Sequence, residues 1–279
     1  MIGLVTDSNA QLPSELKERY QVEVVPLTVV VDGVEYLEGV DLDADDFYAR
    51  FGAGRPQVST SQPSPGRFAA AYEAVAERGA TEILSVHIGS SVSGTVNAAR
   101  LASQVSQVPV RIVDTGTASF AVSLCLWEAA EAIAAGANVE EAAAAAERVS
   151  AAVGNVFVVG ALDMARAGGR LAGGVEAATT VPVLTLSGGV MCEVDRCSGL
   201  EETAGAMAAF VAAAGPSLRV GVGLSDASSR PLVVALEDRL RNALEVIDLV
   251  RYRIGPSVGA HTGPGTVGAM FARTAPGGA

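Results

Sequence analysis

The segment His87-Ile88-Gly89-Ser90-Ser91-Val92-Ser93-Gly94-Thr95 joins a short apolar run to a helical pattern. The run 82–88 is rich in branched residues, as expected of a buried parallel strand. Apolar residues then recur at helical spacing, and a Ser or Thr near Ser93 is predicted to cap the helix. The sequence therefore predicts a strand, a polar turn and a helix.

Two further segments place hydroxyl side chains at similar turns. Thr6-Asp7-Ser8 follows the apolar run 2–5, and a hydroxyl-rich turn over 58–66 leads into a helix that carries Pro65 in its first turn. Ligands of open α/β sheets bind at the carboxyl ends of the strands. Hydroxyl donors and the free N–H groups of a helix start suit a carboxylate or a phosphate. Together the turns predict one shared anion pocket.

The wider pattern predicts an α/β chain of two domains. Strands and helices alternate through 1–153, which indicates a parallel, doubly wound sheet flanked by helices. Within it, 22–31 is predicted as one long strand, and Asp32-Gly33 predicts a hairpin after it. In 154–279, two strand-like runs over 185–195 predict another hairpin, and strands alternate with helices afterwards. This half is predicted to be an α+β domain with a mixed sheet.

Composition excludes several classes of function. The 279 residues carry a formal net charge of -12, which argues against a nucleic-acid surface, because phosphate binding needs clustered Lys and Arg. The first strand begins at once, without the pattern of a secretory signal. Apolar stretches such as 118–135 are interrupted by Ser and Glu, so we expect buried helices and no membrane insertion.

Cysteine and histidine usage narrows the chemistry further. Cys125, Cys192 and Cys197 form no Cys-x-x-Cys motif, which argues against a disulfide framework and a zinc ribbon and favours a cytoplasmic protein. His87 and His261 are the two histidines, so a site built from several His ligands is excluded. No cofactor or metal is expected, although a carboxylate site for magnesium or calcium stays open.

Two motifs have a functional and a structural interpretation. His261 lies in a glycine-rich tail over 254–268, predicted as a loop, and either serves the site or stabilises that loop. Arg166-Ala167-Gly168-Gly169-Arg170 either binds a planar oxyanion or caps a helix and pairs with an acid. A hydrolase could use Ser91 or Ser93 with His261 as base, although Gly-x-Ser-x-Gly is not matched.

In this order and spacing, the motifs resemble the DegV family of bacterial fatty-acid-binding proteins. The residues that carry the resemblance are Thr6-Asp7-Ser8, Thr60-Ser61-Gln62-Pro63-Ser64, Ser93-Gly94-Thr95, Gly168-Gly169-Arg170, and 255–265 with His261.

The resemblance implies that one long-chain fatty acid lies between the two domains, with its tail in an apolar tunnel. It implies that Thr60 and Ser93 bind the carboxylate, with Ser61 and Ser90 adjacent and His261 near the head group. Gly94, Thr95 and Arg170 belong to the same motifs and are assigned to the ligand site. The alternatives are a serine hydrolase of acyl esters and a binding protein for another small anion.

In some relatives the protein presents its fatty acid to a separate kinase, which implies a carrier and not an enzyme. The family often has Lys at the position of Val181, and a basic segment where this chain has Arg196-Cys197-Ser198-Gly199. Glu201 and Glu202 replace further basic positions. If that surface serves the kinase, these departures weaken the partnership and leave lipid binding unaffected.

Overall fold

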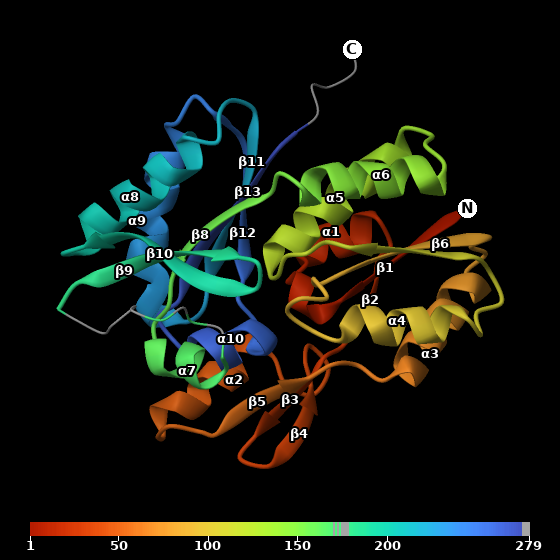
Figure 1. Cartoon of the computed structure of the whole chain (residues 1–279), viewed down its shortest axis with the longest axis horizontal. Coiled ribbons are helices and arrows are strands. Elements are labelled where there is room, and N and C mark those ends of the chain that lie inside the picture. The colour runs from red at the N-terminus through yellow and green to blue at the C-terminus, as the bar shows by residue number, and fades with distance from the viewer. Residues whose placement is uncertain (170, 172, 174–178, 275–279) are drawn as a thin grey trace.

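A computed structural model describes residues 1–169, 171, 173 and 179–274. The strands of this described part form sheets of four, six and three strands. The two larger sheets lie in separate lobes, and the three-stranded sheet lies below them in Figure 1. The α/β class, the parallel first sheet and the mixed second sheet are confirmed.

The four-stranded sheet has the order β2-β1-β6-β7 and parallel pairing throughout. Leu4 and Leu84 face one core, whereas their neighbours Val5 and Ile83 face the other, as the two-residue period of a strand requires. The elements of this half are β1 (Ile2–Asp7), η1 (Ser8–Ala10), α1 (Ser14–Arg19), β2 (Glu23–Val25), α3 (Pro65–Glu77), β6 (Glu82–His87), α4 (Thr95–Ser103), β7 (Val110–Asp114), α5 (Phe120–Ala134) and α6 (Val139–Ser150). Helices α3 and α4 cover one face, and α5 and α6 cover the other.

The prediction of one long strand over 22–31 was wrong. Pro26, which lacks an N–H donor, separates β2 from β3 (Thr28–Val31), and the two strands belong to different sheets. The hairpin at Asp32-Gly33 is confirmed, because both residues adopt positive φ and β3 pairs with β4 (Val34–Leu37).

The hydroxyl-rich segment 58–61, predicted as part of a turn, is instead strand β5 (Val58–Ser61). It pairs antiparallel with β3 and opposes Thr60 to Val29. The turn comes only after it, where the Ser64 side chain caps α3. Helix α2 (Ala44–Ala49) and η2 (Arg50–Gly52) lie between β4 and β5.

The six-stranded sheet has the order β10-β9-β8-β13-β11-β12. Its elements are β8 (Gly154–Val158), β9 (Val181–Ser187), β10 (Val190–Cys197), α8 (Leu200–Ala212), β11 (Leu218–Leu224), η3 (Ala227–Ser229), α9 (Arg230–Arg241), β12 (Val246–Arg253) and β13 (Val267–Arg273). The predicted hairpin is β9–β10. Helices α8 and α9 pack on one face, and the other face meets α5, where Phe120 stacks on Tyr252 with ring centroids 4.7 Å apart.

Three elements of the second half escaped prediction. Helix α7 (Leu162–Ala167) follows β8, and the glycine-rich tail contains helix α10 (Pro256–Thr262) and strand β13. His261 therefore lies on a helix, and its prediction as a loop residue was wrong. Helix α10 contacts α7, α2, η1, β3 and β5, and it lies at the centre of the view in Figure 1.

The two lobes also contact each other away from this helix. The Arg219 guanidinium of β11 lies 3.8 Å from the ring centroid of Trp127 and pairs with Glu131 of α5 and Asp248 of β12.

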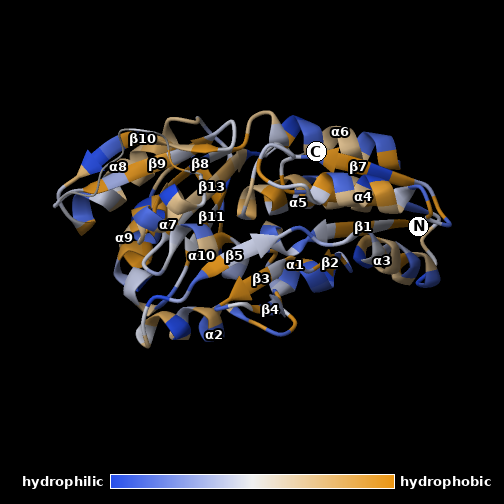
Figure 2. Ribbon diagram, turned by 60° about the horizontal axis from the view of Figure 1, so that its bottom comes forward, coloured by the Kyte–Doolittle hydropathy of each residue, from blue (hydrophilic) through white to orange (hydrophobic). Residues whose placement is uncertain are grey.

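Hydrophobic residues follow strands such as β3 and β9, and hydrophilic residues line the outer turns of α3 and α9 (Figure 2). The domain boundary at 153/154 falls between α6 and β8 and stays a prediction.

Candidate functional site

Two of the three polar segments, 58–66 and 87–95, line one cavity of about 350 Å³, which we call the hydroxyl cavity, and Asn9, which follows the third segment, joins them. The cavity is lined by Asn9, Leu27, Thr60, Ser61, Gln62, Ile88, Val92, Ser93, Gly94, Ser257 and His261. These residues come from the ends of β1 and β6, from β5 and from α10. The turns over 58–66 and 87–95 therefore share one pocket as predicted, whereas Thr6-Asp7-Ser8 contributes no lining residue of its own.

Thr60 and His261 form the contact between β5 and α10. Thr60 Oγ1 lies 3.1 Å from His261 Nε2, so the imidazole and the hydroxyl form a hydrogen bond. Both side chains are half-buried and line the cavity. A hydrogen bond donated by His261 Nε2–H to Thr60 Oγ1 leaves the Thr60 hydroxyl proton to be donated to an anion.

Ser93 and Thr95 organise the start of α4. Ser93 Oγ lies 2.8 Å from Thr95 Oγ1 and accepts a hydrogen bond from the Thr95 backbone N–H at 3.3 Å. Gly94 occupies the N-cap position without a side-chain cap, so the prediction of a capping hydroxyl at that position was wrong. A Cβ at Gly94 would lie 1.7 Å from Oε1 of the exposed Gln62 side chain, so a larger residue here would require that side chain to move.

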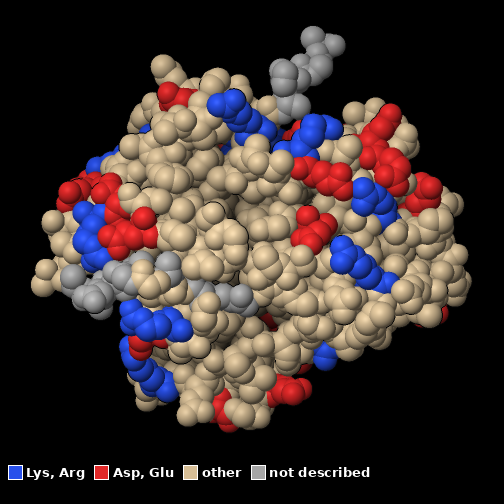
Figure 3. All heavy atoms as spheres, viewed as in Figure 1, with Lys and Arg blue, Asp and Glu red and all other residues tan. Residues whose placement is uncertain are grey.

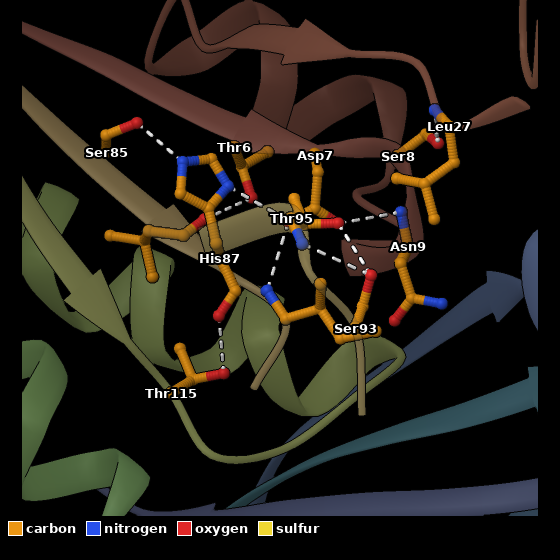
Figure 4. A network of polar contacts seen from close by, with 12 residues as sticks. Thr6, Asp7, Ser8, Asn9, Leu27, Ser85, His87, Ser93, Thr95 and Thr115 are labelled. Carbon is orange, nitrogen blue, oxygen red and sulfur yellow. Dashed lines mark hydrogen bonds and ion pairs between the residues drawn. The ribbon is translucent and has the colours of Figure 1, made fainter. Parts of the chain in front are cut away.

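A buried network holds the ends of β1 and β6 behind this turn (Figure 4). The Asp7 carboxylate accepts hydrogen bonds from the N–H groups of Asn9 at 3.1 Å and Ile88 at 3.0 Å, and it lies 2.9 Å from His87 Nδ1. His87 Nε2 lies 2.6 Å from Ser85 Oγ. The order Ser85, His87, Asp7 is that of a hydrolase triad, but each side chain is 0% exposed. The network therefore positions the turn.

Three polar residues of the cavity, Asn9, Gln62 and Ser257, were not among the predicted site residues. Asn9 Nδ2 donates to Ser257 Oγ at 3.2 Å, and Asn9 Oδ1 accepts from the Ser119 N–H at 2.9 Å. Asn9 thus connects β1 to both α10 and α5. Its signal was its place directly after Thr6-Asp7-Ser8, at the carboxyl end of a predicted strand.

The other predicted site residues lie in different places. Ser61 and Gly94 line the cavity and are exposed. Thr95 is fully buried beneath Ser93, and Ser90 is exposed outside the lining, with its N–H bonded to Asp114. Arg170 lies outside the described residues.

A second, apolar cavity of about 80 Å³ adjoins the hydroxyl cavity. It lies between the six-stranded sheet and the start of α5, and its lining includes Phe157, Leu186, Met191, Tyr252, Val258, Gly268 and Met270. Val258 follows Ser257 in the chain, and Ser119, which lines the apolar cavity, is hydrogen bonded to Asn9. The linings of the two cavities are therefore adjacent at these residues, although they have no residue in common.

Among the described residues that line the hydroxyl cavity there is no Lys or Arg. Charged side chains lie mainly around the rim of the face shown in Figure 3, and the seam between the lobes is largely uncharged. Within the described ranges, no cluster of His, Cys, Asp or Glu could hold a metal ion, and no helix is long and apolar enough to cross a bilayer. An anion in this cavity would therefore be hydrogen bonded by hydroxyl, amide and imidazole groups.

This chain is similar to proteins of one family along nearly its whole length. The model of the DegV family, described as uncharacterised proteins, matches residues 1–274. A DegV domain-containing protein of Streptomyces coelicolor is 35% identical over 96% of this chain and 97% of its own. A DegV family protein of Thermus thermophilus, described by its fatty acid binding, is 31% identical, with a TM-score of 0.88 over 98% of this chain and 99% of its own. A Thermotoga maritima protein, described as revealing a fatty acid binding function, is 28% identical, with a TM-score of 0.86 over 98% and 99%.

Proposed function

This chain belongs to the DegV family, and from that membership we propose that it binds one long-chain fatty acid. The carboxylate occupies the hydroxyl cavity, and the acyl chain continues into the apolar cavity between the lobes. Thr60 and Ser93 donate hydrogen bonds to the carboxylate, with Ser61, Gly94 and His261 around it. Thr95 orients Ser93 from beneath.

The observation that carries the proposal is that an apolar cavity lies next to a hydroxyl-lined one. An anion alone needs only the first, and a neutral hydrocarbon needs only the second. Burying the tail contributes about 0.8 kcal/mol per methylene, whereas the hydroxyl groups fix the direction of the head group. A molecule with one carboxylate and a long apolar tail matches both.

Native mass spectrometry of the protein purified from cells, followed by solvent extraction, tests the proposal. We expect one fatty acid per chain, which the extraction identifies. A chain that is empty and that also fails to bind fatty acids in a titration would contradict it. Retention of a phosphorylated metabolite in place of a lipid would support the other-anion alternative.

We propose a carrier without catalysis of its own. The hydrolase alternative requires a serine hydroxyl hydrogen bonded to His261 as its base, whereas His261 Nε2 pairs with the Thr60 hydroxyl and Ser93 Oγ pairs with Thr95 Oγ1. The Ser85–His87–Asp7 network is fully buried. Hydrolysis of an acyl ester that disappears in Ser93→Ala would overturn this part of the proposal.

A kinase partner, if the protein has one, would have to accept an acidic surface. Val181 pairs with Cys197 at the end of the β9–β10 hairpin, and Ser198 donates its N–H to Glu202 at 2.6 Å. Glu201 pairs with Arg239. If the basic surface of relatives serves a kinase, the acidic residues here weaken that partnership and leave the proposed lipid binding unaffected. We also propose a cytoplasmic location, because Cys125, Cys192 and Cys197 form no disulfide with one another.

A further inference from the structure

Glu38 is a buried carboxylate, 6% exposed, that does not line the hydroxyl cavity. It follows β4 and faces the start of α10. Ser8 Oγ donates to Glu38 Oε2 at 2.5 Å, and the Ser257 N–H donates to Oε1 at 2.8 Å. Gln11 Nε2 donates to Oε1 at 3.3 Å. A Cβ at Gly255 would lie 2.6 Å from Glu38 Oε1, so the chain passes close to the carboxylate only because glycine is there.

Glu38 lies between two cavities. Ser257, its hydrogen-bond partner, lines the hydroxyl cavity. Glu38 itself lines a cavity of about 520 Å³, which we call the rear cavity, together with Ser8 and Gln11. Ser257 therefore separates the Glu38 carboxylate from the proposed ligand head group, and solvent reaches the carboxylate through the rear cavity.

The hydroxyl group of Ser257 has a single proton to donate. Its oxygen accepts hydrogen bonds from Asn9 Nδ2 at 3.2 Å and Gln11 Nε2 at 3.4 Å. Its proton can therefore be directed to the Glu38 carboxylate, with which the side chain interacts, or to an oxygen in the hydroxyl cavity. A bound carboxylate would compete with Glu38 for this one donor.

We propose that Ser257 and Glu38 form a proton-linked pair. When a carboxylate enters the hydroxyl cavity, Ser257 donates its hydrogen bond to it, and Glu38 takes up a proton from solvent through the rear cavity. The inference rests on the proposed function and adds to it a further ligand-binding residue, Ser257, and a dependence of affinity on pH. Glu38 acts through Ser257 and is a positioning residue.

The physical reason is that two negative charges on either side of Ser257 repel each other in a poorly solvated region. Burial already raises the pKa of Glu38, although hydrogen bonds from Ser8, Ser257 and Gln11 act in the opposite direction. A second negative charge nearby favours its protonation further. Ligand binding and protonation of Glu38 are thermodynamically linked, and such linkage is reciprocal. Protonation of Glu38 therefore also favours binding of the ligand carboxylate.

Other titratable or charged groups surround Glu38. They are Asp7 behind η1, Glu15, Lys17, Asp43, Arg251, Tyr252 and Arg253 around the rear cavity, Tyr48 of α2 and His261 of α10. Since Glu38→Gln leaves all of them in place, the ratio of wild-type to variant affinity isolates the contribution of Glu38. The amide keeps an acceptor for the Ser257 N–H and can donate to Ser8 Oγ.

The test compares wild type and Glu38→Gln by calorimetric titration with a long-chain fatty acid and with the alcohol of the same chain length. We expect the variant to bind the acid about fivefold or more tightly than wild type at a pH where Glu38 is ionised, and the ratio to fall towards one as pH is lowered through the raised pKa of Glu38. For the neutral alcohol the ratio stays near one across the same pH range. Wild type takes up protons on binding the acid, as titrations in buffers of different ionisation enthalpy measure.

A ratio that is constant with pH, or equal for acid and alcohol, would overturn the inference, because a merely structural role affects both ligands alike. If Glu38→Gln melts early, Ser257→Ala provides the test. We expect it to weaken acid binding about tenfold, to affect the alcohol less and to reduce proton uptake. Equal losses for both ligands would refute the pair. If wild type binds no fatty acid at all, the proposed function itself fails.

Discussion

Gly268→Val tests whether the apolar cavity holds the acyl tail. Gly268 belongs to β13, and a Cβ there would lie 3.5 Å from atoms of Met270, Phe157 and Tyr252, which is ordinary van der Waals contact. Since Gly268 lines the apolar cavity, the two methyl groups of valine would extend into its roughly 80 Å³. Valine is also favoured in strands, so the sheet should tolerate it.

The expected loss follows from the displaced tail. Excluding two or three methylenes costs about 2 kcal/mol at about 0.8 kcal/mol each, which is about thirtyfold in affinity. The assay is a titration with a series of saturated fatty acids of increasing chain length. We expect the loss for long acids, whereas short acids whose tails do not reach Gly268 should bind equally to both proteins.

Gly52→Val is the matched control, because a Cβ at this exposed glycine would have nothing within 4 Å. Thermal melting of both variants checks that the fold is retained. Undiminished binding of long acids by Gly268→Val, or the same loss at every chain length, would refute the assignment of the apolar cavity to the tail.

Three further predictions concern the head group, the buried acid and the contact between the lobes. Thr60→Val should weaken fatty acid binding by about tenfold or more, since a hydrogen bond to a charged group contributes roughly 1.5 to 3 kcal/mol, whereas Thr81→Val at an exposed site should bind as wild type does. Because burial raises the pKa of Glu38 in the folded protein, its ionisation opposes folding at neutral pH, and this cost disappears as pH falls through the folded pKa towards the usual 4.5. Glu38→Gln should therefore melt above wild type at neutral pH, with the difference shrinking as pH is lowered; a constant difference would contradict this. Arg219→Ala should lower the free energy of unfolding by about 2 kcal/mol and shift the fluorescence of Trp127, and unchanged denaturant curves would show that this contact is dispensable.

Local signals in the sequence were sufficient for much of the fold and for the position of the pocket. The two predicted hairpins depend on residues within a few positions of each other. The pocket followed from a general rule on the carboxyl ends of parallel strands, because polar residues occur there after both β1 and β6.

The glycine-rich tail could not be predicted in this way, because its structure depends on distant partners. Strand β13 pairs with β8 on one side and β11 on the other, so its stability comes from segments far away in the sequence. Helix α10 has only seven residues, too few for a helical period to stand out, and it is held by contacts with both lobes. His261 and Ser257 reach the cavity only through this helix. The split at Pro26 did have a local signal, since proline within an apolar run argues against a continuous strand.

The chemistry of the hydroxyl cavity suits a carrier that must release what it binds. An arginine fork would hold a carboxylate through paired, charge-assisted hydrogen bonds, but the described lining offers hydroxyl, amide and imidazole groups instead. With the acyl tail already contributing about 0.8 kcal/mol per methylene, a strong cationic clamp would slow dissociation of the long acids further. Neutral donors fix the direction of the head group while leaving affinity to the tail. Ionisation of Glu38 behind Ser257 would weaken the head-group contact without any change in the tail, which gives the protein a means of release that does not depend on chain length.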